Sequence, residues 1–295
     1  MTVKLIRFIA TALLLACLGL QPGRAASTVD PLHPYAYGAN VGWLNARGNI
    51  TNGAVIGQYY CTGFVWSANC GWIGLGNGPV NGWRYGNAAS SDWGVNHDGE
   101  GRLTGLAYGA NIGWITFEQT YGQPRVDLRT GNFAGYAYGA NVGWISLSNA
   151  QAFVRTTLFD TGPDSDGDGL PDPWEYRHTN DLTALVGGNH DADGDGATDS
   201  NEYGADTDPF DDGSLFEIVG YSARNPSNTV RWTSRPTRLY RVEATNALAV
   251  YQGGWQDVGG GLIGPPSSSP AEAMITGVIQ TSRYYRVRAV RPLSE

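Results

Sequence analysis

Alternating large and small side chains mark a nonamer that recurs four times in the first half of the chain. It reads YAYGANVGW at 35–43 and again at 136–144, LAYGANIGW at 106–114 and FVWSANCGW at 64–72. In each copy a Gly- or Asn-containing element separates two short runs of aromatic and branched residues. Gly and Asn tolerate left-handed backbone angles, so each copy predicts a strand, a turn and a second strand.

The four copies together predict an aromatic β-repeat domain over residues 27–158. Their turn Asn residues are separated by 29, 42 and 30 positions, and the middle interval contains an insertion, NGWRYGNAASSDWG. A single hairpin is marginally stable, so the copies are expected to stack and bury their aromatic face. This interpretation makes the repeated Trp residues mostly buried and equivalent. The alternative is that exposed Trp and Tyr form platforms for sugar rings. The residues concerned are Asn40, Asn69, Asn111 and Asn141, and Trp43, Trp72, Trp114 and Trp144.

A second series of short alternating segments fills residues 214–295. The alternation predicts strands at 216–223, 229–233, 239–244, 255–258, 271–276 and 284–290, separated by turn-rich stretches such as GGGLIGPPSSSP. This pattern of short strands predicts a small β-sandwich of the fibronectin or immunoglobulin type. The fold class expected for the whole chain is therefore mostly β.

Charge distinguishes the intervening segment, residues 159–213. Residues 160–212 contain 16 of the 27 acidic residues and a single Arg. The chain has a net charge of −8, and this acidic balance argues against a nucleic-acid partner.

The acidic segment contains two copies of a calcium-loop pattern, D-x-D-x-D-G-x5-E. They are DSDGDGLPDPWE at 164–175 and DADGDGATDSNE at 191–202. Ca²⁺ takes six to eight oxygen ligands, here carboxylates at loop positions 1, 3 and 5, a carbonyl at 7, position 9 often through water, and a bidentate Glu at 12. The alternative is a solvated acidic linker without a metal. The expected ligands of the two Ca²⁺ ions are Asp164, Asp166, Asp168, Leu170, Asp172 and Glu175, and Asp191, Asp193, Asp195, Ala197, Asp199 and Glu202.

These residues carry a family resemblance. The run DSDGDGLPDPWEYRHTN…DADGDGATDSNEYGADTDPFDD resembles the thrombospondin type 3 repeats of bacterial exported proteins, and is similar to the EF-hand-like loops of dockerins. The resemblance covers residues 164–212 and implies Ca²⁺ binding at the positions named. It departs from eukaryotic thrombospondin in lacking cysteines between the repeats, and from dockerins in lacking a clear partner-recognition pair.

Short helical turns are expected after each loop, at PWEYRHTN and SNEYG. Helices of this length are unstable alone, and no apolar core is expected in the segment. The metal is therefore expected to hold it together.

The N-terminus predicts export. Lys4 and Arg7 precede an apolar run at 8–20, and QPGRAA offers cleavage after Ala25 or Ala26. The alternative is a lipobox, LLAC, ending at Cys17. Either signal places the protein outside the cell, secreted or on the outer surface, and no transmembrane segment is expected in the mature chain.

In an exported chain, Cys61 and Cys70 are expected to form a disulfide. Both replace residues that are apolar in the other copies. A plain hairpin centred on Asn69 separates the two thiols, so the bond requires a wider arch. The alternative is that both remain reduced and buried as small apolar side chains.

Catalytic motifs are absent from the sequence. It contains neither G-x-S-x-G nor H-E-x-x-H, and its four His residues are scattered. No enzyme is therefore predicted. The expected function is that of an exported calcium-binding modular protein with a structural or adhesive role at the cell surface or in extracellular matrix. Extracellular polysaccharide or other surface proteins are its expected partners. The alternative is a glycan-binding protein that uses the aromatic repeat domain.

Overall fold

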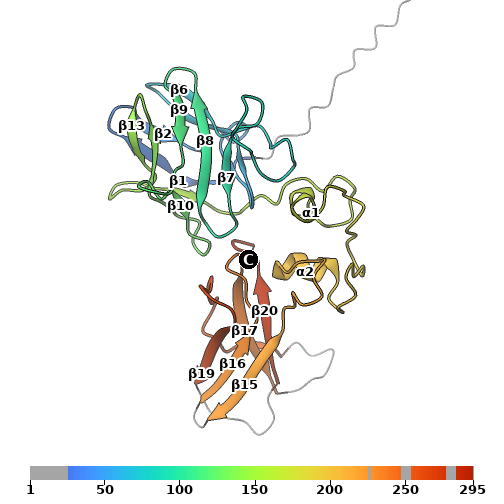
Figure 1. The fold of residues 1–295 in the computed structure, drawn as a ribbon. Coiled ribbons are helices and arrows are strands. Elements are labelled where there is room, and N and C mark those ends of the chain that lie inside the picture. Colours follow the sequence, from blue (N-terminus) through green and yellow to red (C-terminus); the bar gives the residue numbers. More distant parts are fainter. Residues whose placement is uncertain (1–25, 225–226, 247–253, 277–283, 295) are drawn as a thin grey trace, which may run out of the picture.

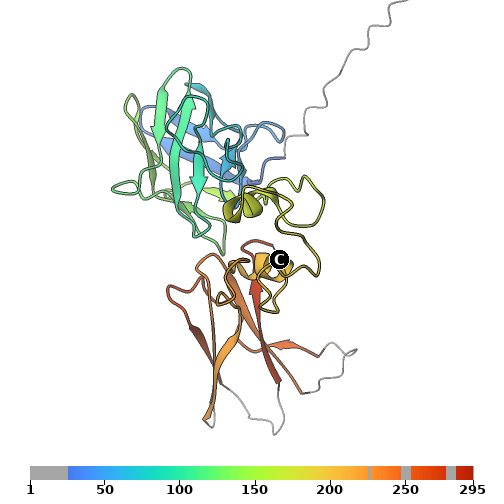
Figure 2. The same ribbon diagram turned by 45° about the vertical axis from the view of Figure 1, so that its right-hand side comes forward.

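The computed structural model describes residues 26–224, 227–246, 254–276 and 284–294, and its fold is mostly β, as predicted (Figure 1). The predicted export signal and Cys17 lie outside the described residues. The repeat region lies at one end of the molecule and the C-terminal region at the other. The acidic segment runs beside both of them, as the second view also shows (Figure 2).

Four hairpins form a closed eight-stranded barrel. The strands follow the order β13-β12-β9-β8-β6-β5-β2-β1, and pairing of β13 with β1 completes the circle. Closure leaves no free edge, so the copies do not need to stack as separate layers. The hairpins are β1 (Val29–Gly38) with β2 (Gly42–Asn45), β5 (Phe64–Ser67) with β6 (Gly71–Gly74), β8 (Leu103–Gly109) with β9 (Gly113–Thr116), and β12 (Tyr136–Gly139) with β13 (Gly143–Ser146).

Shorter strands occupy the connections. The strand β7 pairs with β8, and β14 pairs with the first half of β1, while the others form two small ladders, β3 with β4 and β10 with β11. They are β3 (Val55–Ile56), β4 (Cys61–Thr62), β7 (Val95–His97), β10 (Arg125–Val126), β11 (Phe133–Ala134) and β14 (Val154–Thr156).

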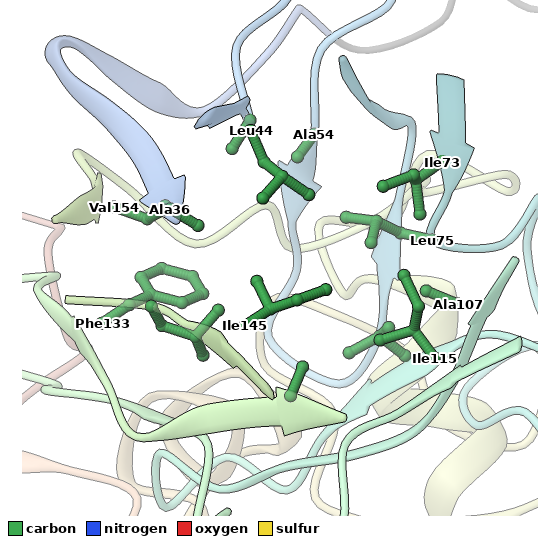
Figure 3. Packing of buried hydrophobic residues seen from close by; sticks show 14 of the residues in the cluster. Ala36, Leu44, Ala54, Ile73, Leu75, Ala107, Ile115, Phe133, Ile145 and Val154 are labelled. Carbon is green, nitrogen blue, oxygen red and sulfur yellow. The ribbon is translucent and has the colours of Figure 1, made fainter. Parts of the chain in front are cut away.

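Small and branched side chains fill the barrel interior (Figure 3). Side chains alternate between the inside and the outside of the barrel along each strand. The inward-facing residues pair across a hairpin as a small residue on one strand and a large residue on the other. Ala36 thus faces Leu44, and Ala137 faces Ile145. An eight-stranded barrel has room for about this much side-chain volume, so its core needs no aromatic ring from the nonamer.

The repeated Trp residues lie on the outside of the barrel, so the prediction that they are buried is wrong. Trp43, Trp72, Trp114 and Trp144 are 48%, 40%, 45% and 43% exposed. They are equivalent, as expected, because each lies directly opposite an aromatic residue of its own hairpin. The physical reason is the alternation itself: with the following Leu or Ile turned inward, the Trp must turn outward.

The turn Asn residues join the four hairpins into a ring, which supports a structural role for these positions. Each Asn Nδ2 donates a hydrogen bond to a turn carbonyl of the neighbouring hairpin, and the four bonds close on themselves. They run from Asn40 to Val142 (3.1 Å), from Asn69 to Val41 (3.0 Å), from Asn111 to Cys70 (3.2 Å) and from Asn141 to Ile112 (3.0 Å). The Gly before each Trp has φ between +71° and +78°, as a left-handed turn requires.

The predicted disulfide is absent, and this prediction is corrected: Cys61 and Cys70 are both free and buried. Cys61 begins β4 and Cys70 lies in the turn after β5, so the whole of β5 separates them. The extended backbone of that strand spans about 10 Å, beyond the Cα separation of about 7 Å that a disulfide can bridge. Cys61 lines the barrel interior, and Cys70 closes one turn. Both act as small apolar side chains.

The acidic segment contains two short helices, as predicted: α1 (Asp172–His178) and α2 (Asp199–Ala205), each of which begins at position 9 of a loop. Contrary to expectation it also has a small apolar core, formed by Leu170, Trp174, Leu185 and Tyr203 with Tyr59 of the barrel. Within the described residues, neither helix combines the length and apolar composition that a membrane span requires.

The C-terminal region consists of two three-stranded antiparallel sheets that share one buried cluster, including Trp232 and Tyr240. All six predicted strands occur, and the last two have the predicted bounds. The first sheet contains β15 (Ile218–Arg224), β16 (Ser227–Trp232) and β19 (Ala271–Thr276), and the second contains β17 (Leu239–Thr245), β18 (Gln256–Asp257) and β20 (Tyr284–Val290).

Candidate metal centre

The first three Asp residues of each loop converge. Asp164, Asp166 and Asp168 each place a ligand oxygen within 4.8 Å of the others. The backbone turns around the first carboxylate, because Asp164 accepts hydrogen bonds from the N–H groups of Gly167 (2.8 Å) and Gly169 (3.1 Å).

The second loop repeats the same arrangement. Asp191, Asp193 and Asp195 form its oxygen cluster, again within 4.8 Å of one another. Asp191 accepts from Gly194 at 2.8 Å and from Gly196 at 3.0 Å. Two loops with matching local geometry follow directly from the two matching sequence patterns.

Each Asp cluster interacts electrostatically with the buried Glu at position 12 of its loop. Glu175 is fully buried, and neither of its carboxylate oxygens has a hydrogen-bond partner among the described residues. Glu202 is also fully buried; its Oε1 accepts from the Thr207 hydroxyl at 3.0 Å, and its Oε2 has no such partner. Unpartnered buried carboxylate oxygens are costly unless a cation or proton satisfies them. These residues therefore fit a divalent cation with oxygen ligands.

The electrostatics of both Glu residues agree with this fit. Burial raises the pKa of Glu175 to about 8, with Asp168 and Asp166 adding to the effect. Burial also raises the pKa of Glu202 to about 7, while the hydrogen bond from Thr207 opposes the rise. Each site thus concentrates negative charge that favours protonation in the absence of a cation, and a bound Ca²⁺ would favour the ionised form.

The Asp at position 9 of each loop accepts hydrogen bonds from nearby backbone N–H groups. Asp172 accepts hydrogen bonds from the backbone N–H of Ser165 at 2.7 Å and from its hydroxyl at 2.5 Å. Asp199 accepts from the N–H groups of Ala192 and Val186, each at 3.0 Å. Both residues therefore fasten the start of a helix to the backbone at or just before the beginning of its loop.

Position 7 of each loop donates its N–H to the Asp at position 5. The N–H of Leu170 donates to Asp168 at 2.8 Å, and that of Ala197 donates to Asp195 at 2.6 Å. The structure thus brings the carboxylates of positions 1, 3 and 5 of each loop together, and it buries the Glu of position 12 where their charges act on it.

Sequence reasoning missed the residues that connect the two loops. The N–H of Gly187 donates to Asp168 of the first loop at 2.6 Å, and the adjacent N–H of Val186 donates to Asp199 of the second. His190 also contacts Asp199, with 2.7 Å between Nδ1 and Oδ2. Backbone donors carry no sequence signature, so only the position of His190 beside the second loop could have indicated this connection.

The helix after the first loop is attached to the barrel. Trp174 of α1 packs with Tyr59 in the small apolar core. The guanidinium of Arg177 lies over the Tyr59 ring, 5.7 Å from its centroid. The helix α1 therefore links the first loop to the barrel.

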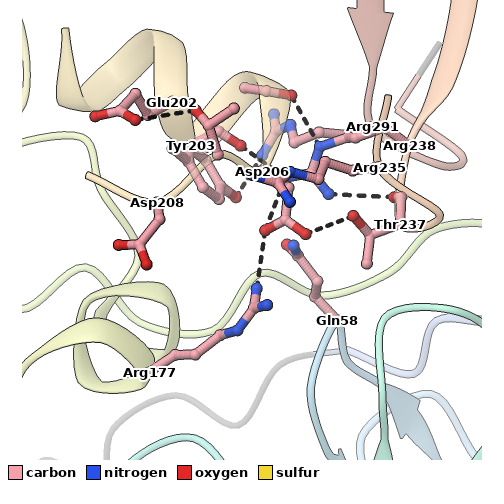
Figure 4. Close-up of polar contacts among 12 residues, drawn as sticks. Gln58, Arg177, Glu202, Tyr203, Asp206, Asp208, Arg235, Thr237, Arg238 and Arg291 are labelled. Atoms are coloured by element: carbon pink, nitrogen blue, oxygen red, sulfur yellow. Dashed lines mark hydrogen bonds and ion pairs between the residues drawn. The ribbon is translucent and has the colours of Figure 1, made fainter. Parts of the chain in front are cut away.

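The helix after the second loop is attached to the C-terminal region (Figure 4). Arg238 donates to the carbonyls of Gly204 at 2.8 Å and Tyr203 at 2.6 Å, so a cation covers the free carbonyls at the end of α2. Asp206, which ends the helix, bonds to Arg177 at 2.9 Å and to the hydroxyl of Thr237. Asp206 is thus a junction between the two loops and the C-terminal sheets.

Comparison of the chain with models of protein families, with curated proteins and with solved structures gives no match in any of the three.

Proposed function

We propose that this chain is an exported calcium-binding modular protein in which residues 159–213 bind two Ca²⁺ ions and fasten the barrel to the C-terminal sheets. Its role is structural or adhesive, at the cell surface or in extracellular matrix. The observation that carries the proposal is a pair of converging Asp clusters, each interacting electrostatically with a fully buried Glu, Glu175 or Glu202, that has at least one carboxylate oxygen without a hydrogen-bond partner among the described residues. The resemblance of the two loops to thrombospondin type 3 repeats supports Ca²⁺ in particular.

The contacts of the two helices explain how the ions would act. Each helix begins inside a loop and ends against a different domain, so an ordered loop fixes the position of that helix. A helix of seven residues has little stability alone, and binding energy at the loop is therefore folding energy for the segment. The two sheets with their shared core are consistent with a small sandwich as the C-terminal domain.

Calorimetric titration with Ca²⁺ tests the site assignment. The wild-type chain should bind two ions, with a Kd on the order of 10⁻⁴ to 10⁻³ M or tighter. Glu175→Gln and Glu202→Gln should each remove one ion, and the double variant should bind none. Glu217→Gln replaces an exposed Glu outside both loops and should still bind two. Two ions bound by the double variant would refute the assignment.

A second candidate function is glycan binding by the barrel. The specific observation that favours it is the exposure of the repeated Trp residues, since the core does not need them. The two functions are compatible, because the outer face of the barrel and the calcium loops involve different residues.

A further inference from the structure

The outer face of the barrel carries a repeated group of three aromatic rings, here called the aromatic belt. In each hairpin two rings face each other across the strands, with centroids 4.8–5.0 Å apart, and a third ring lies 5.3–6.2 Å from the Trp. The belt consists of Tyr35, Tyr37 and Trp43; Phe64, Trp66 and Trp72; Trp93, Tyr108 and Trp114; and Tyr136, Tyr138 and Trp144.

The third hairpin shows that three rings are kept even where the repeated sequence lacks one. Its nonamer begins with Leu106, where the other copies have Tyr or Phe. The insertion before this hairpin supplies Trp93 instead, whose ring meets that of Trp114 edge to face at 5.3 Å. The third ring of this group therefore comes from a different segment of the chain. If the rings served only to stabilise each hairpin through its cross-strand pair, no third ring would be needed.

The rings are held in place while they remain exposed. A Cβ added at Gly48 would lie 2.9 Å from the Trp72 ring, and one at Gly122 would lie 3.2 Å from the Trp144 ring. These connecting loops therefore lie close against the edges of Trp72 and Trp144, while about two-fifths of the surface of each ring stays open. Immobile rings lose little conformational entropy when a ligand covers them.

Small polar or open positions lie beside the rings. Across the boundary between hairpins, Tyr37 faces Ser146, Tyr138 faces Thr116 and Trp66 faces Asn45. A flat apolar ring next to a hydroxyl or amide matches the two kinds of surface on a pyranose sugar, namely its C–H face and its hydroxyl rim. None of the belt residues is charged, which favours an uncharged ligand.

We propose that the aromatic belt binds neutral polysaccharide made of β-linked pyranose units, through four equivalent ring groups around the barrel. A polymer that presents the same flat face at each unit suits a surface that repeats the same ring group. Several weak contacts along one chain would then add through effective concentration. This inference rests on the second candidate function above and is independent of calcium binding.

Affinity electrophoresis of the mature chain in gels containing hydroxyethylcellulose, a neutral β-linked glucan, tests the proposal. The wild type should be retarded, and the double variant Trp43→Ala/Trp144→Ala should bind at least about tenfold more weakly, as for truncated aromatic anchors. Trp43→Phe/Trp144→Phe keeps the cross-strand packing and should fall between the two. Phe210→Ala removes an exposed ring outside the barrel and should migrate as the wild type does. Thermal unfolding confirms that each variant is folded.

Several results would overturn the proposal. Unretarded migration of the wild type, or equal retardation of the double Trp→Ala variant and the wild type, would remove it. Sedimentation showing a dimer that the same Trp→Ala changes disperse would assign the belt to a second copy of the chain. Co-sedimentation with phosphatidylcholine vesicles, lost in the same variant, would assign it to lipid. The Glu175→Gln/Glu202→Gln variant should lose Ca²⁺ and remain retarded, so the two proposals fail separately.

Discussion

The barrel and residues 159–213 are both built from copies of a short motif, but the copies relate to each other differently. In the barrel a repeated residue, Asn, bonds each copy to the next, and the copies close into one ring. In the acidic segment the first three Asp residues of each motif turn toward a centre within their own copy. Contacts between these two copies depend on residues outside the motif, such as Gly187 and Arg177.

The difference shows what repetition achieves in each case. The barrel needs all of its copies, because a hairpin removed from the ring exposes the interior and two strand edges. The two acidic loops, at 164–175 and 191–202, are local structures, and the helix of each is tied to a different domain. We therefore expect the barrel to respond to change as a unit and the calcium segment to respond one loop at a time.

Removing Ca²⁺ should have the largest effect and should separate the two regions. At Ca²⁺ concentrations of 100 times Kd, each site contributes about 2.7 kcal/mol to the stability of the structure that binds it. Chelation should therefore raise amide hydrogen exchange throughout 159–213 and leave the barrel strands protected. An equal rise in amide hydrogen exchange in the barrel strands would show that the barrel fold also depends on the ions, and that the two regions do not respond separately.

Removing one ion at a time should show that the two loops are separable. With Ca²⁺ present, Glu202→Gln should raise exchange at α2 and at its contact with Arg238 by at least about tenfold, equivalent to about 1.4 kcal/mol. Glu175→Gln should do the same at α1 and near Tyr59. Identical exchange patterns in the two variants would mean that the segment opens as a single unit through the contacts of Gly187 and Asp206.

Breaking one bond of the Asn ring should have a smaller effect. Asn141→Asp removes the amide that donates to Ile112 and should lower the free energy of unfolding of the barrel by about 1 kcal/mol in urea denaturation. Asn149→Asp is a matched control, because the side-chain oxygen of Asn149 accepts from the N–H groups of Gln151 and Ala152, whereas its side-chain nitrogen donates no hydrogen bond within the part of the chain that the structure describes. The same change at Asn40, Asn69 or Asn111 should cost a similar amount. A large loss at one position alone would contradict their equivalence.

The smallest effect is a pH dependence carried by the barrel. His97 is buried, its Nδ1 lies 3.0 Å from the carbonyl oxygen of Gly57, and burial lowers the pKa of its imidazole. The unfolded chain binds this proton below about pH 6.5, so stability should fall as the pH falls below that value, by at most about 1.4 kcal/mol per unit. His97→Gln should flatten this slope in Ca²⁺-saturated protein. An unchanged slope would exclude His97 as its source.

The sequence located the hairpins and the loops but not the direction of the aromatic rings. Both faces of a repeat strand are apolar, with Ala36 on one and Tyr37 on the other, so alternation alone leaves the buried face undecided. Which face is buried is set when β13 pairs with β1 and closes the barrel. This pairing joins segments distant in the sequence, and no short sequence pattern predicts it. Once the barrel is closed, its narrow interior has room for the smaller side chains, such as Ala36, and the aromatic side chains face outward.

The calcium loops were more predictable because their geometry is local. Carboxylates spaced two residues apart around a Gly turn converge whatever surrounds them, and Glu175 follows on the first helical turn. The bracing role of Asp172 was not predictable, since it depends on how the helix packs against the loop start. The apolar core was missed for a similar reason: Leu170, Trp174, Leu185 and Tyr203 are spread over both copies and meet only in the fold.

Closure of the barrel by the pairing of β13 with β1 has a consequence for the order in which the chain connects the hairpins. Every hairpin has the same two neighbours whichever hairpin the chain enters first, because the pairing of β13 with β1 does not involve a connecting loop. Val29 pairs with Thr156, so the two ends of the barrel also lie side by side. The barrel should therefore tolerate circular permutation: joining those ends with a short linker and opening the chain between two other hairpins would preserve every strand pair. Because the last strand of this region, β14, pairs with β1, the chain leaves the barrel beside the point at which it entered. The acidic segment therefore starts next to the first strand.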